Sequence, residues 1–259
     1  PDISPNTVLN NMYTIALIPA RYNSSRFPGK LMQILEDKTV ILNTYQAAVN
    51  TGLFRQVVVV TDSSEIFREI VSHGGSARMS LKEHSCGSDR IAEAAVFYPE
   101  AELIVNVQGD EPFISAAPLA ALIDAFKGPE GKDTDLASLM CPIRDKNLIN
   151  NPNVVKVVTN RDGYALLFSR APIPFIRDNE TLDVPFYRHI GVYAFRRPAL
   201  LRFASLQAGP LEKAEKLENL RFLEYGMKIK MIEVSHFGPG IDVPEELEMA
   251  RAMKKQEKK

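Results

Sequence analysis

Residues 13–30 read YTIALIPARYNSSRFPGK, an apolar run that passes directly into a loop carrying three cations. The apolar part, Tyr13–Ile18, has the composition of a β-strand. Val57–Val60 and Leu103–Val107 are nearly continuous apolar runs, as in strands covered on both faces, and helical patterns lie between the runs. This alternation predicts a βαβαβ arrangement on a mainly parallel sheet, with the last two strands in central positions.

Between the second and third of these strands, one helix carries clear signals at both ends, and the organisation changes after Asp110. Ile66 and Ile70 share a face of that helix, Ser63 or Ser64 can cap its start, and Gly74–Gly75 can end it. The other expected elements are a helix at about Ala116–Phe126, extended stretches at Leu136–Pro142, Val154–Thr159 and Tyr164–Phe168 with a turn at Asn160–Gly163, a strand at Ile190–Phe195, helices at about Pro198–Leu206 and Leu211–Tyr225, a strand at Ile229–Val234 and a helix from Pro244.

Domain organisation follows from what is absent between these elements. The periodic sequence begins near Met12, so residues 1–11 are expected to be a native extension or residues added in cloning. No repeat or linker divides the remainder, which predicts one domain over residues 12–259. Residues 171–185 have few regular signals and form a long irregular excursion, and such loops are usually functional or interfacial.

Composition excludes several classes of protein. The 259 residues include 31 Lys and Arg against 32 Asp and Glu, a net charge of −1, and 45% of them are hydrophobic, as in a soluble globular protein. Balanced charge argues against a nucleic-acid partner. Two cysteines without a CxxC motif argue against a disulfide framework or a usual zinc site. No apolar run reaches the ~18 residues of a membrane helix, so we expect a cytoplasmic protein without a membrane partner.

The loop after the first strand is the first candidate site. Arg21, Arg26 and Lys30 follow the strand end, where an α/β sheet presents its ligand crevice. Arg and Lys crowded together suit a polyphosphate, which would neutralise them. A solvated basic loop is the alternative, but the position at a strand end favours binding. Neither a Walker motif nor a GxGxxG fingerprint is present.

Acidic residues supply two further candidates. Residues 106–112 read NVQGDEP and follow a buried strand, so Asp110 is placed to hold Mg²⁺ together with phosphate oxygens. Asp and Gly are also ordinary turn residues, and this segment alone leaves both possibilities open. Asp242 with Pro244 is fully explained as a helix start, and only a partner carboxylate would make Asp242 a metal ligand.

Residues 84–90, HSCGSDR, are the fourth candidate because they open a helix with a polar loop. Gly87 would let a planar base approach the backbone, and Arg90 adds a guanidinium. A simple cap by Ser88 is an equally good interpretation. Cys86 lies two residues from His84, but no orienting third group is apparent, so a cysteine nucleophile is disfavoured.

Together these segments resemble the CMP-Kdo synthetases, or 3-deoxy-manno-octulosonate cytidylyltransferases, from about Tyr13 to Met253. The resemblance implies an α/β fold with a Rossmann-like mixed sheet of the nucleotide-diphospho-sugar transferase type, in a homodimer. It also implies that CTP and the eight-carbon acid sugar Kdo are joined to give CMP-Kdo and pyrophosphate, for lipopolysaccharide biosynthesis. The segments that carry it are Pro19–Arg21 with Ser24, Arg26 and Pro28–Lys30; Thr61–Asp62; Asn106–Pro112; Val155–Val158; Phe168–Arg170; His189–Tyr193; Leu217–Arg221; and Asp242–Glu245.

Site residues are carried over from the family onto matching positions. The implied catalytic residues are Arg21, Lys30, Asp110 and Asp242, of which Asp110 and Asp242 bind Mg²⁺. The implied nucleotide contacts are Ala20, Arg21, Arg26, Lys30, Ser85, Gly87, Ser88, Arg90 and Gln108. The implied sugar contacts are Arg170, His189, Tyr193, Glu218 and Asn219.

Three other functions stay open at this point. A cytidylyltransferase for 8-amino-Kdo or a sialic-acid-type sugar would share the fold, although the match around His189 and Leu217–Arg221 favours Kdo. A glycosyltransferase of related fold would consume a UDP-sugar without releasing pyrophosphate. A regulatory nucleotide-binding protein would bind without turnover, and the paired aspartates argue against it.

Overall fold

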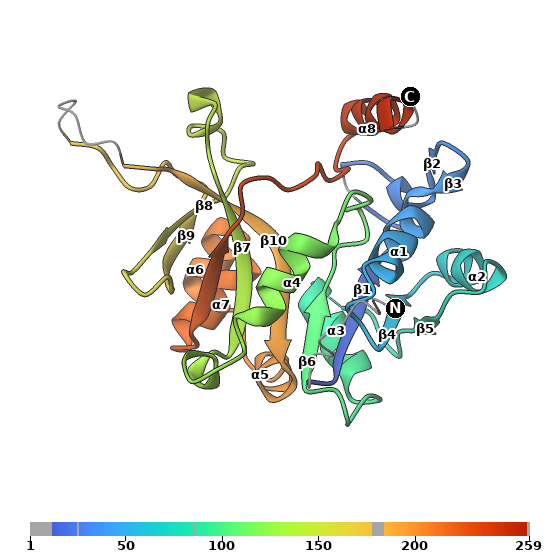
Figure 1. The fold of residues 1–259 in the computed structure, drawn as a ribbon, viewed down its shortest axis with the longest axis horizontal. Coiled ribbons are helices and arrows are strands. Elements are labelled where there is room, and N and C mark those ends of the chain that lie inside the picture. The colour runs from blue at the N-terminus through green and yellow to red at the C-terminus, as the bar shows by residue number, and fades with distance from the viewer. Residues whose placement is uncertain (1–11, 25, 85, 178–183, 258–259) are drawn as a thin grey trace, which may run out of the picture.

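The structure is a computed structural model and describes residues 12–24, 26–84, 86–177 and 184–257. A nine-stranded mixed sheet runs through these residues in the order β11-β7-β10-β6-β1-β4-β5, and β8 and β9 branch from β10 (Figure 1). Its strands are β1 (Thr14–Ala20), β4 (Gln56–Thr61), β5 (Ala77–Met79), β6 (Leu103–Asn106), β7 (Leu136–Pro142), β8 (Lys156–Thr159), β9 (Ala165–Ser169), β10 (Tyr187–Arg196) and β11 (Ile229–Glu233).

The first half of the sheet is parallel, as the alternation predicts. β1 lies between β4 and β6 and pairs with both in parallel. The connections are α1 (Val40–Asn50), α2 (Ser64–Ser72) and α3 (Gly87–Ala95). The sequence pattern missed β5 and the ribbon of β2 (Ile34–Leu35) and β3 (Lys38–Thr39), because elements of two or three residues are too short to show a period.

The second half reverses direction and makes the sheet mixed, so the expected fold class is confirmed. β10 lies between β6 and β7 and is antiparallel to both, while β11 is parallel to β7. The register of β10 on β7 shifts between Ile190 and Tyr193. The expected turn between β8 and β9 is also confirmed, since Asn160 Oδ1 accepts a hydrogen bond from the Tyr164 N–H at 2.8 Å and Gly163 has a φ of +77°.

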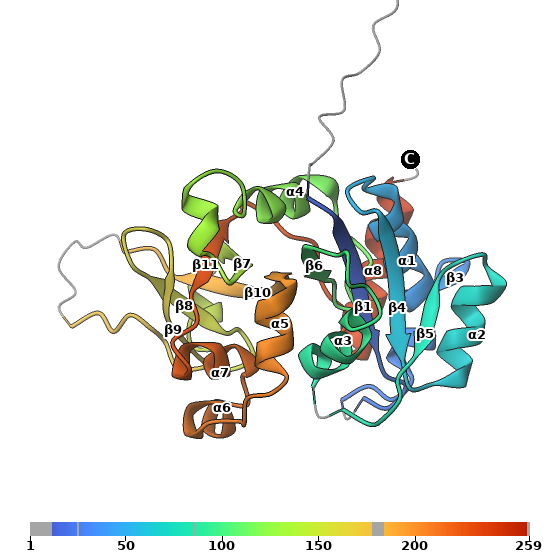
Figure 2. The same ribbon diagram turned by 90° about the horizontal axis from the view of Figure 1, so that it is seen from below.

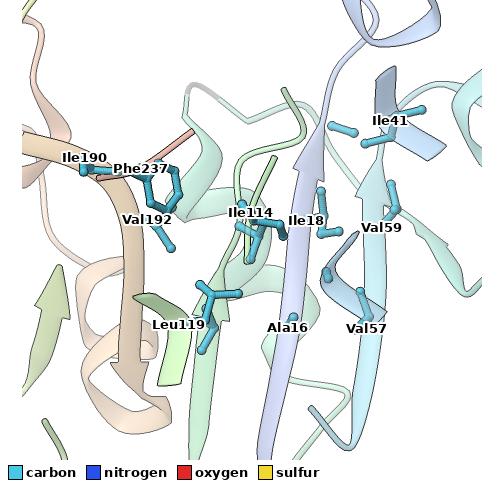
Figure 3. Close-up of a cluster of buried hydrophobic side chains, with 14 of the residues drawn as sticks. Ala16, Ile18, Ile41, Val57, Val59, Ile114, Leu119, Ile190, Val192 and Phe237 are labelled. Carbon is cyan, nitrogen blue, oxygen red and sulfur yellow. The ribbon is translucent and has the colours of Figure 1, made fainter. Parts of the chain in front are cut away.

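Two hydrophobic layers cover the two faces of this sheet. Along β1, Ile15 and Leu17 enter one layer, which includes side chains of α3, and Ala16 and Ile18 enter the other, which includes side chains of α1. This two-residue alternation is what a strand covered on both sides requires. Figure 2 shows α3 and α4 (Ala116–Asp124) on opposite sides of the sheet, and Figure 3 shows the layer around Ile18.

Helix ends agree with the sequence signals in one case and differ in another. The Ser63 hydroxyl accepts a hydrogen bond from the Ile66 N–H at 3.3 Å, which confirms the cap of α2. The single helix expected at Leu211–Tyr225 is wrong: α6 (Pro210–Glu215) and α7 (Glu218–Glu224) are separated by Lys216, whose φ is +56°, and Leu217. The apolar periodicity that predicted this helix rests on Leu217, Leu220 and Leu223. All three lie after Lys216, so the pattern gave no information on the break.

The remaining helices are α5 (Arg197–Phe203) and α8 (Pro244–Glu257), with 3-10 turns at Lys30–Met32, Glu130–Asp133 and Lys146–Leu148. The described parts of the 171–185 excursion, residues 171–177 and 184–185, contain neither helix nor strand. The extension expected at residues 1–11 lies outside the described residues. Across the described ranges, no helix is both long and apolar enough to span a membrane.

Candidate active site

The cationic loop begins where β1 ends. Its course from Arg21 to Lys30 is closed by a hydrogen bond of 3.1 Å from the Gly29 N–H to the Tyr22 carbonyl. Gly29 has a φ of +67°, in the left-handed region that glycine adopts without strain. Lys30 follows as the first residue of a 3-10 turn, and its side chain is only 12% exposed. The loop therefore directs Lys30 inward, while Arg21 stays exposed.

The segment after β6 lies against this loop. A Cβ on Gly109 would be 3.2 Å from both the Pro19 carbonyl oxygen and Ile41 Cδ1, so a larger residue would push the two loops apart. Thr44 of α1 donates a hydrogen bond of 2.9 Å to the Gly109 carbonyl. These two contacts fix the backbone immediately before Asp110.

The chain returns to the same place just before α8. The Ile241 N–H donates a hydrogen bond of 2.9 Å to the Asp110 carbonyl, which aligns the two acidic segments. The backbone N–H groups of Asp242 and Val243 donate to Glu246 Oε2 at 2.6 and 3.2 Å. Glu246 thus performs the capping role that the sequence attributed to Asp242. The Asp242 carboxylate is left for other partners.

Those partners are two cations of the loop. The Lys30 ammonium donates to Asp110 Oδ2 and, at 2.8 Å, to Asp242 Oδ1. Arg26 donates to Asp242 Oδ2 at 2.9 Å. The two aspartates of the resemblance therefore meet at one nitrogen atom, although they come from distant parts of the chain.

The charges of this group stabilise one another. Burial disfavours the charged form of Lys30, but Asp110 and Asp242 outweigh that effect and raise its pKa. Burial likewise opposes ionisation of Asp242, yet Lys30 and Arg26 hold the pKa of its carboxyl below the usual value. Beside them, burial and the charges of Asp110 and Asp242 raise the pKa of Glu111.

Two carboxylates that share one cation also fit a divalent metal ion. The residues that the structure describes contain no cluster of three or more metal-ligating side chains. Asp110 and Asp242 would therefore supply two ligands, with phosphate oxygens and water completing the shell, which is the coordination that Mg²⁺ prefers. The Lys30 ammonium, held between both carboxylates, marks the space where a cation is stabilised.

These groups line one cavity of about 280 Å³ at the carboxyl ends of β1 and β6. Of the expected nucleotide contacts, seven line it: Ala20, Arg21, Arg26, Lys30, Gly87, Arg90 and Gln108. Ser85 lies outside the described residues. Ser88 is buried at 2% exposure and does not line the cavity. It also is not the cap of α3, because that helix begins at Gly87 after Cys86.

Arg90 and Gln108 are held by protein groups at the cavity wall. Arg90 donates to Asp62 Oδ2 at 2.6 Å and to Ser80 Oγ at 2.9 Å. The Gln108 amide donates to the Gly191 carbonyl at 3.0 Å, which ties the segment after β6 to the irregular part of β10. Protein partners thus hold both side chains in place at the cavity wall without a ligand.

The expected sugar contacts divide into three groups. Glu218, at the start of α7, lines the cavity. The rings of His189 and Tyr193, both on β10, contact each other in a tilted arrangement with centroids 5.4 Å apart, and Asn219 is buried with an unpartnered Oδ1. Arg170 does not line the cavity, because its Nε donates to the Glu215 carbonyl at 2.7 Å.

The cavity also contains residues that the sequence left without a role. Cys86 lines it, and burial and the Glu218 charge raise the pKa of the thiol, so it is neutral. A neutral thiol is a weak nucleophile, so the raised pKa supports the expectation that Cys86 is not a nucleophile. His84 lines the cavity as well and pairs with Glu93, a partner nine residues away on α3 that no local motif indicates.

Comparison with known proteins agrees with this geometry. A family model described as Cytidylyltransferase matches residues 15–229. The 3-deoxy-manno-octulosonate cytidylyltransferase of Flavobacterium johnsoniae is 57% identical over 93% of this chain and 98% of its own length. That of Christiangramia forsetii is 56% identical over 92% and 96%.

Solved structures show the same relationship. A CMP:2-keto-3-deoxy-manno-octonic acid synthetase complexed with CTP has a TM-score of 0.87 and 36% identity, covering 94% of this chain and 99% of that one. A 4-diphosphocytidyl-2C-methyl-D-erythritol synthase from Anaerococcus prevotii, at 14% identity and a TM-score of 0.63, shares the fold, with 94% and 99% covered. The chain therefore belongs to the 3-deoxy-manno-octulosonate cytidylyltransferase family.

Proposed function

We propose that this protein joins CTP and the acid sugar Kdo, with Mg²⁺, to give CMP-Kdo and pyrophosphate. The observation that carries the proposal is the shared contact of Asp110 and Asp242 with the Lys30 ammonium, inside a cavity bordered by Arg21 and Arg26. Such a cavity suits a triphosphate, because its cations match phosphate oxygens and its carboxylates match the accompanying metal ion. The relatives carry the same activity in their names.

In this reaction the anomeric hydroxyl oxygen of the sugar forms a bond to the α-phosphorus, and the bond from that phosphorus to the β-phosphate oxygen breaks. The hydroxyl proton is released, and pyrophosphate leaves. Positioning and charge stabilisation carry most of such a transfer. Lys30, Arg21 and Arg26 line the cavity, and we expect them to neutralise the charge that grows on the leaving group. A metal ion held by Asp110 and Asp242 would lower the pKa of the attacking hydroxyl.

The sugar side of the reaction rests on fewer contacts. Glu218 borders the cavity at the start of α7, and the rings of His189 and Tyr193 lie on β10. We propose that the acid sugar binds on this side, facing the nucleotide. The homodimer and the cytoplasmic location expected from the sequence stay predictions.

The decisive experiment measures pyrophosphate release with CTP and Mg²⁺ across a set of acid sugars that includes Kdo, 8-amino-Kdo and a sialic acid. We expect the highest kcat/KM with Kdo. Folded Asp110→Asn protein is the control, and its turnover is expected to fall roughly a hundredfold or more because a metal ligand loses its charge. Higher kcat/KM with another sugar would reject the substrate, and normal turnover of Asp110→Asn would reject the metal assignment.

A further inference from the structure

Asp242 lies in a part of the chain without regular structure. Residues 234–243, between β11 and α8, contain neither helix nor strand. The Asp242 side chain is 44% exposed, whereas that of Asp110, close to the end of β6, is 23% exposed. Secondary structure therefore does not set the direction of the Asp242 carboxylate, and other contacts must hold it against the Lys30 ammonium.

Glu246 fixes the main chain on both sides of Asp242. Its Oε2 accepts hydrogen bonds from the Asp242 N–H at 2.6 Å and from the Val243 N–H at 3.2 Å. The first N–H belongs to the peptide group before the Asp242 α-carbon, and the second belongs to the peptide group after it. These two planar groups define the backbone angles of Asp242 and hence the direction of its Cα–Cβ bond. The Glu246 side chain therefore controls where the Asp242 carboxylate points.

The position of Glu246 is itself fixed, because α8 is anchored to the rest of the molecule. Leu247 is 3% exposed and belongs to the hydrophobic layer that includes α1. Arg251 Nε and Nη2 both donate to the Ile34 carbonyl oxygen, at 3.1 and 2.6 Å, and Figure 1 shows α8 next to the β2–β3 ribbon. That ribbon follows the 3-10 turn that begins with Lys30. Glu246 is thus held on a helix that is attached close to the cationic loop.

Two roles compete for the Asp242 carboxylate. Asp is among the residues preferred as a helix N-cap, and the sequence from Asp242 to Pro244 fits that role. A carboxylate engaged by the first N–H groups of α8 would offer fewer oxygens to a cation. Because Glu246 accepts the N–H groups that precede the helix, both oxygens of Asp242 are available to cations: Oδ1 contacts Lys30 at 2.8 Å and Oδ2 contacts Arg26 at 2.9 Å.

We propose that Glu246 is a positioning residue for the reaction: by accepting the N–H groups of residues 242 and 243, it keeps the Asp242 carboxylate directed at the Lys30 ammonium, where it would hold the metal ion of the proposed function. The inference rests on the proposed function and deepens it, because it assigns the direction of one metal ligand to a side chain outside the lining of the cavity. Residues that orient a metal ligand commonly change metal affinity by about 10–100-fold when they are replaced.

The first test measures the affinity for CTP by calorimetry, once with Mg²⁺ and once with EDTA in its place, and without sugar, so that no turnover is needed. The ratio of the two affinities gives the contribution of the metal ion. In Glu246→Ala this ratio is expected to fall roughly tenfold or more. A purely structural role would change both affinities alike. Glu246→Gln keeps a carbonyl oxygen that can accept both hydrogen bonds, so it is expected to retain most of the ratio.

Glu245→Ala is the matched control. Glu245 lies in the same first turn of α8 with the same charge, but it is exposed and takes neither of the two hydrogen bonds. Its replacement should leave the ratio unchanged. Circular dichroism checks that each variant is folded. Should Glu246→Ala not fold, Glu246→Asp is measured in its place, because a carboxylate shorter by one methylene group cannot reach both N–H groups and should lower the ratio as well.

A crystal structure of the same variant without ligands gives a readout that needs neither a metal ion nor turnover. We expect the Asp242 carboxylate to lose its contact with the Lys30 ammonium. An unchanged contact, or a wild-type ratio of CTP affinities in the folded variant, overturns the inference and leaves the proposed function standing. A wild type that binds CTP more tightly with Mg²⁺ but releases no pyrophosphate rejects the proposed function alone. A wild-type CTP affinity that does not respond to Mg²⁺ overturns both the inference and the metal assignment.

Discussion

Lys30 and Lys156 are both largely buried, but their ammonium groups have opposite kinds of partner. Lys30 lies in the cavity between the carboxylates of Asp110 and Asp242. Lys156, at the start of β8, is 0% exposed and donates only to main-chain carbonyls within the part of the chain that the structure describes. Its three hydrogen bonds reach the oxygens of Asn151 at 3.0 Å, Val154 at 2.6 Å and Arg170 at 2.6 Å.

The difference separates a cation that we propose to act on the substrate from a structural one. The partners of Lys30 are anions that a metal ion can take over, which frees the ammonium for phosphate oxygens. The partners of Lys156 are carbonyls of the 151–154 loop and of Arg170, and of these the Asn151 carbonyl also accepts a hydrogen bond from the Val154 N–H at 3.1 Å. Burial lowers the pKa of Lys156, whereas the pKa of Lys30 is raised because its carboxylate partners outweigh burial. Burial alone therefore does not indicate the role of a lysine.

Lys30→Ala removes the ammonium that we propose to act on the substrate, and it should have the largest effect of the variants considered. Without the ammonium, charge on the leaving pyrophosphate loses a stabilising partner, and kcat is expected to fall roughly 10²–10³-fold. The KM for the sugar is expected to change little, because we propose that Lys30 contacts the phosphates rather than the sugar. Steady-state kinetics with varied CTP and Kdo measure both quantities.

Arg26→Gln is the control for loss of a nearby positive charge, because among the described residues Arg26 pairs with Asp242 and its side chain is 56% exposed. Its effect on kcat should be smaller than that of Lys30→Ala. A Lys30→Ala variant that changed only the KM for the sugar would remove Lys30 from the phosphate site.

Lys156→Met removes the ammonium of the structural lysine, and its effect should be the second largest. Methionine matches the length of the aliphatic stem but removes a donor from three partly buried carbonyls, of which that of Asn151 keeps the Val154 N–H, so the free energy of unfolding should fall by about 2–4 kcal/mol. Denaturant unfolding measures this loss. At a temperature where the variant is folded, kcat is expected to stay near the wild-type value. A stability equal to that of the wild type would show that water replaces the ammonium without cost.

The sequence predicts one of these two lysines. Lys30 follows a strand end with other cations, and position and charge together indicate a phosphate site. Lys156 lies in an apolar stretch that predicts only a strand. Its role depends on carbonyls from the 151–154 loop and from Arg170, which come together only when β8 pairs with β9. Hydrogen bonds to main-chain carbonyls that folding brings together cannot be predicted from the local sequence.

Among the candidate site residues, too, some could be predicted from the sequence and others could not. Asp110 could be placed by its strand end, but Asp242 fits an ordinary helix start, and only the structure shows that Glu246 takes over the cap. The pairing of His84 with Glu93, like the break between α6 and α7, depends on tertiary contacts rather than on periodicity. Strand ends were predictable because the apolar runs mark them. Side-chain partners far apart in the sequence were not.

His189 lies beside the loop that holds Lys156. Its protonation should have the smallest effect of those predicted. The His189 N–H donates to the Val155 carbonyl at 2.8 Å, and its ring contacts Phe168 and Tyr193. Burial lowers the pKa of His189 to about 3, so the ring is neutral near pH 7. This part of the sheet thus accommodates the Lys156 ammonium, which three carbonyl groups hold, but disfavours a positive charge on the His189 ring.

The low pKa of His189 predicts a pH dependence of stability with a definite sign. The unfolded chain, in which histidine has a pKa near 6.5, binds the proton more readily than the folded protein does. Stability is therefore complete above about pH 6.5 and should fall by about 1–2 kcal/mol as the pH decreases to 5. His189→Gln removes this titration, so its unfolding free energy should depend less on pH across the same interval. Denaturant unfolding of both proteins at pH 7, 6 and 5 measures the two slopes, and equal slopes would mean that His189 takes up its proton in the folded protein as easily as in the unfolded chain.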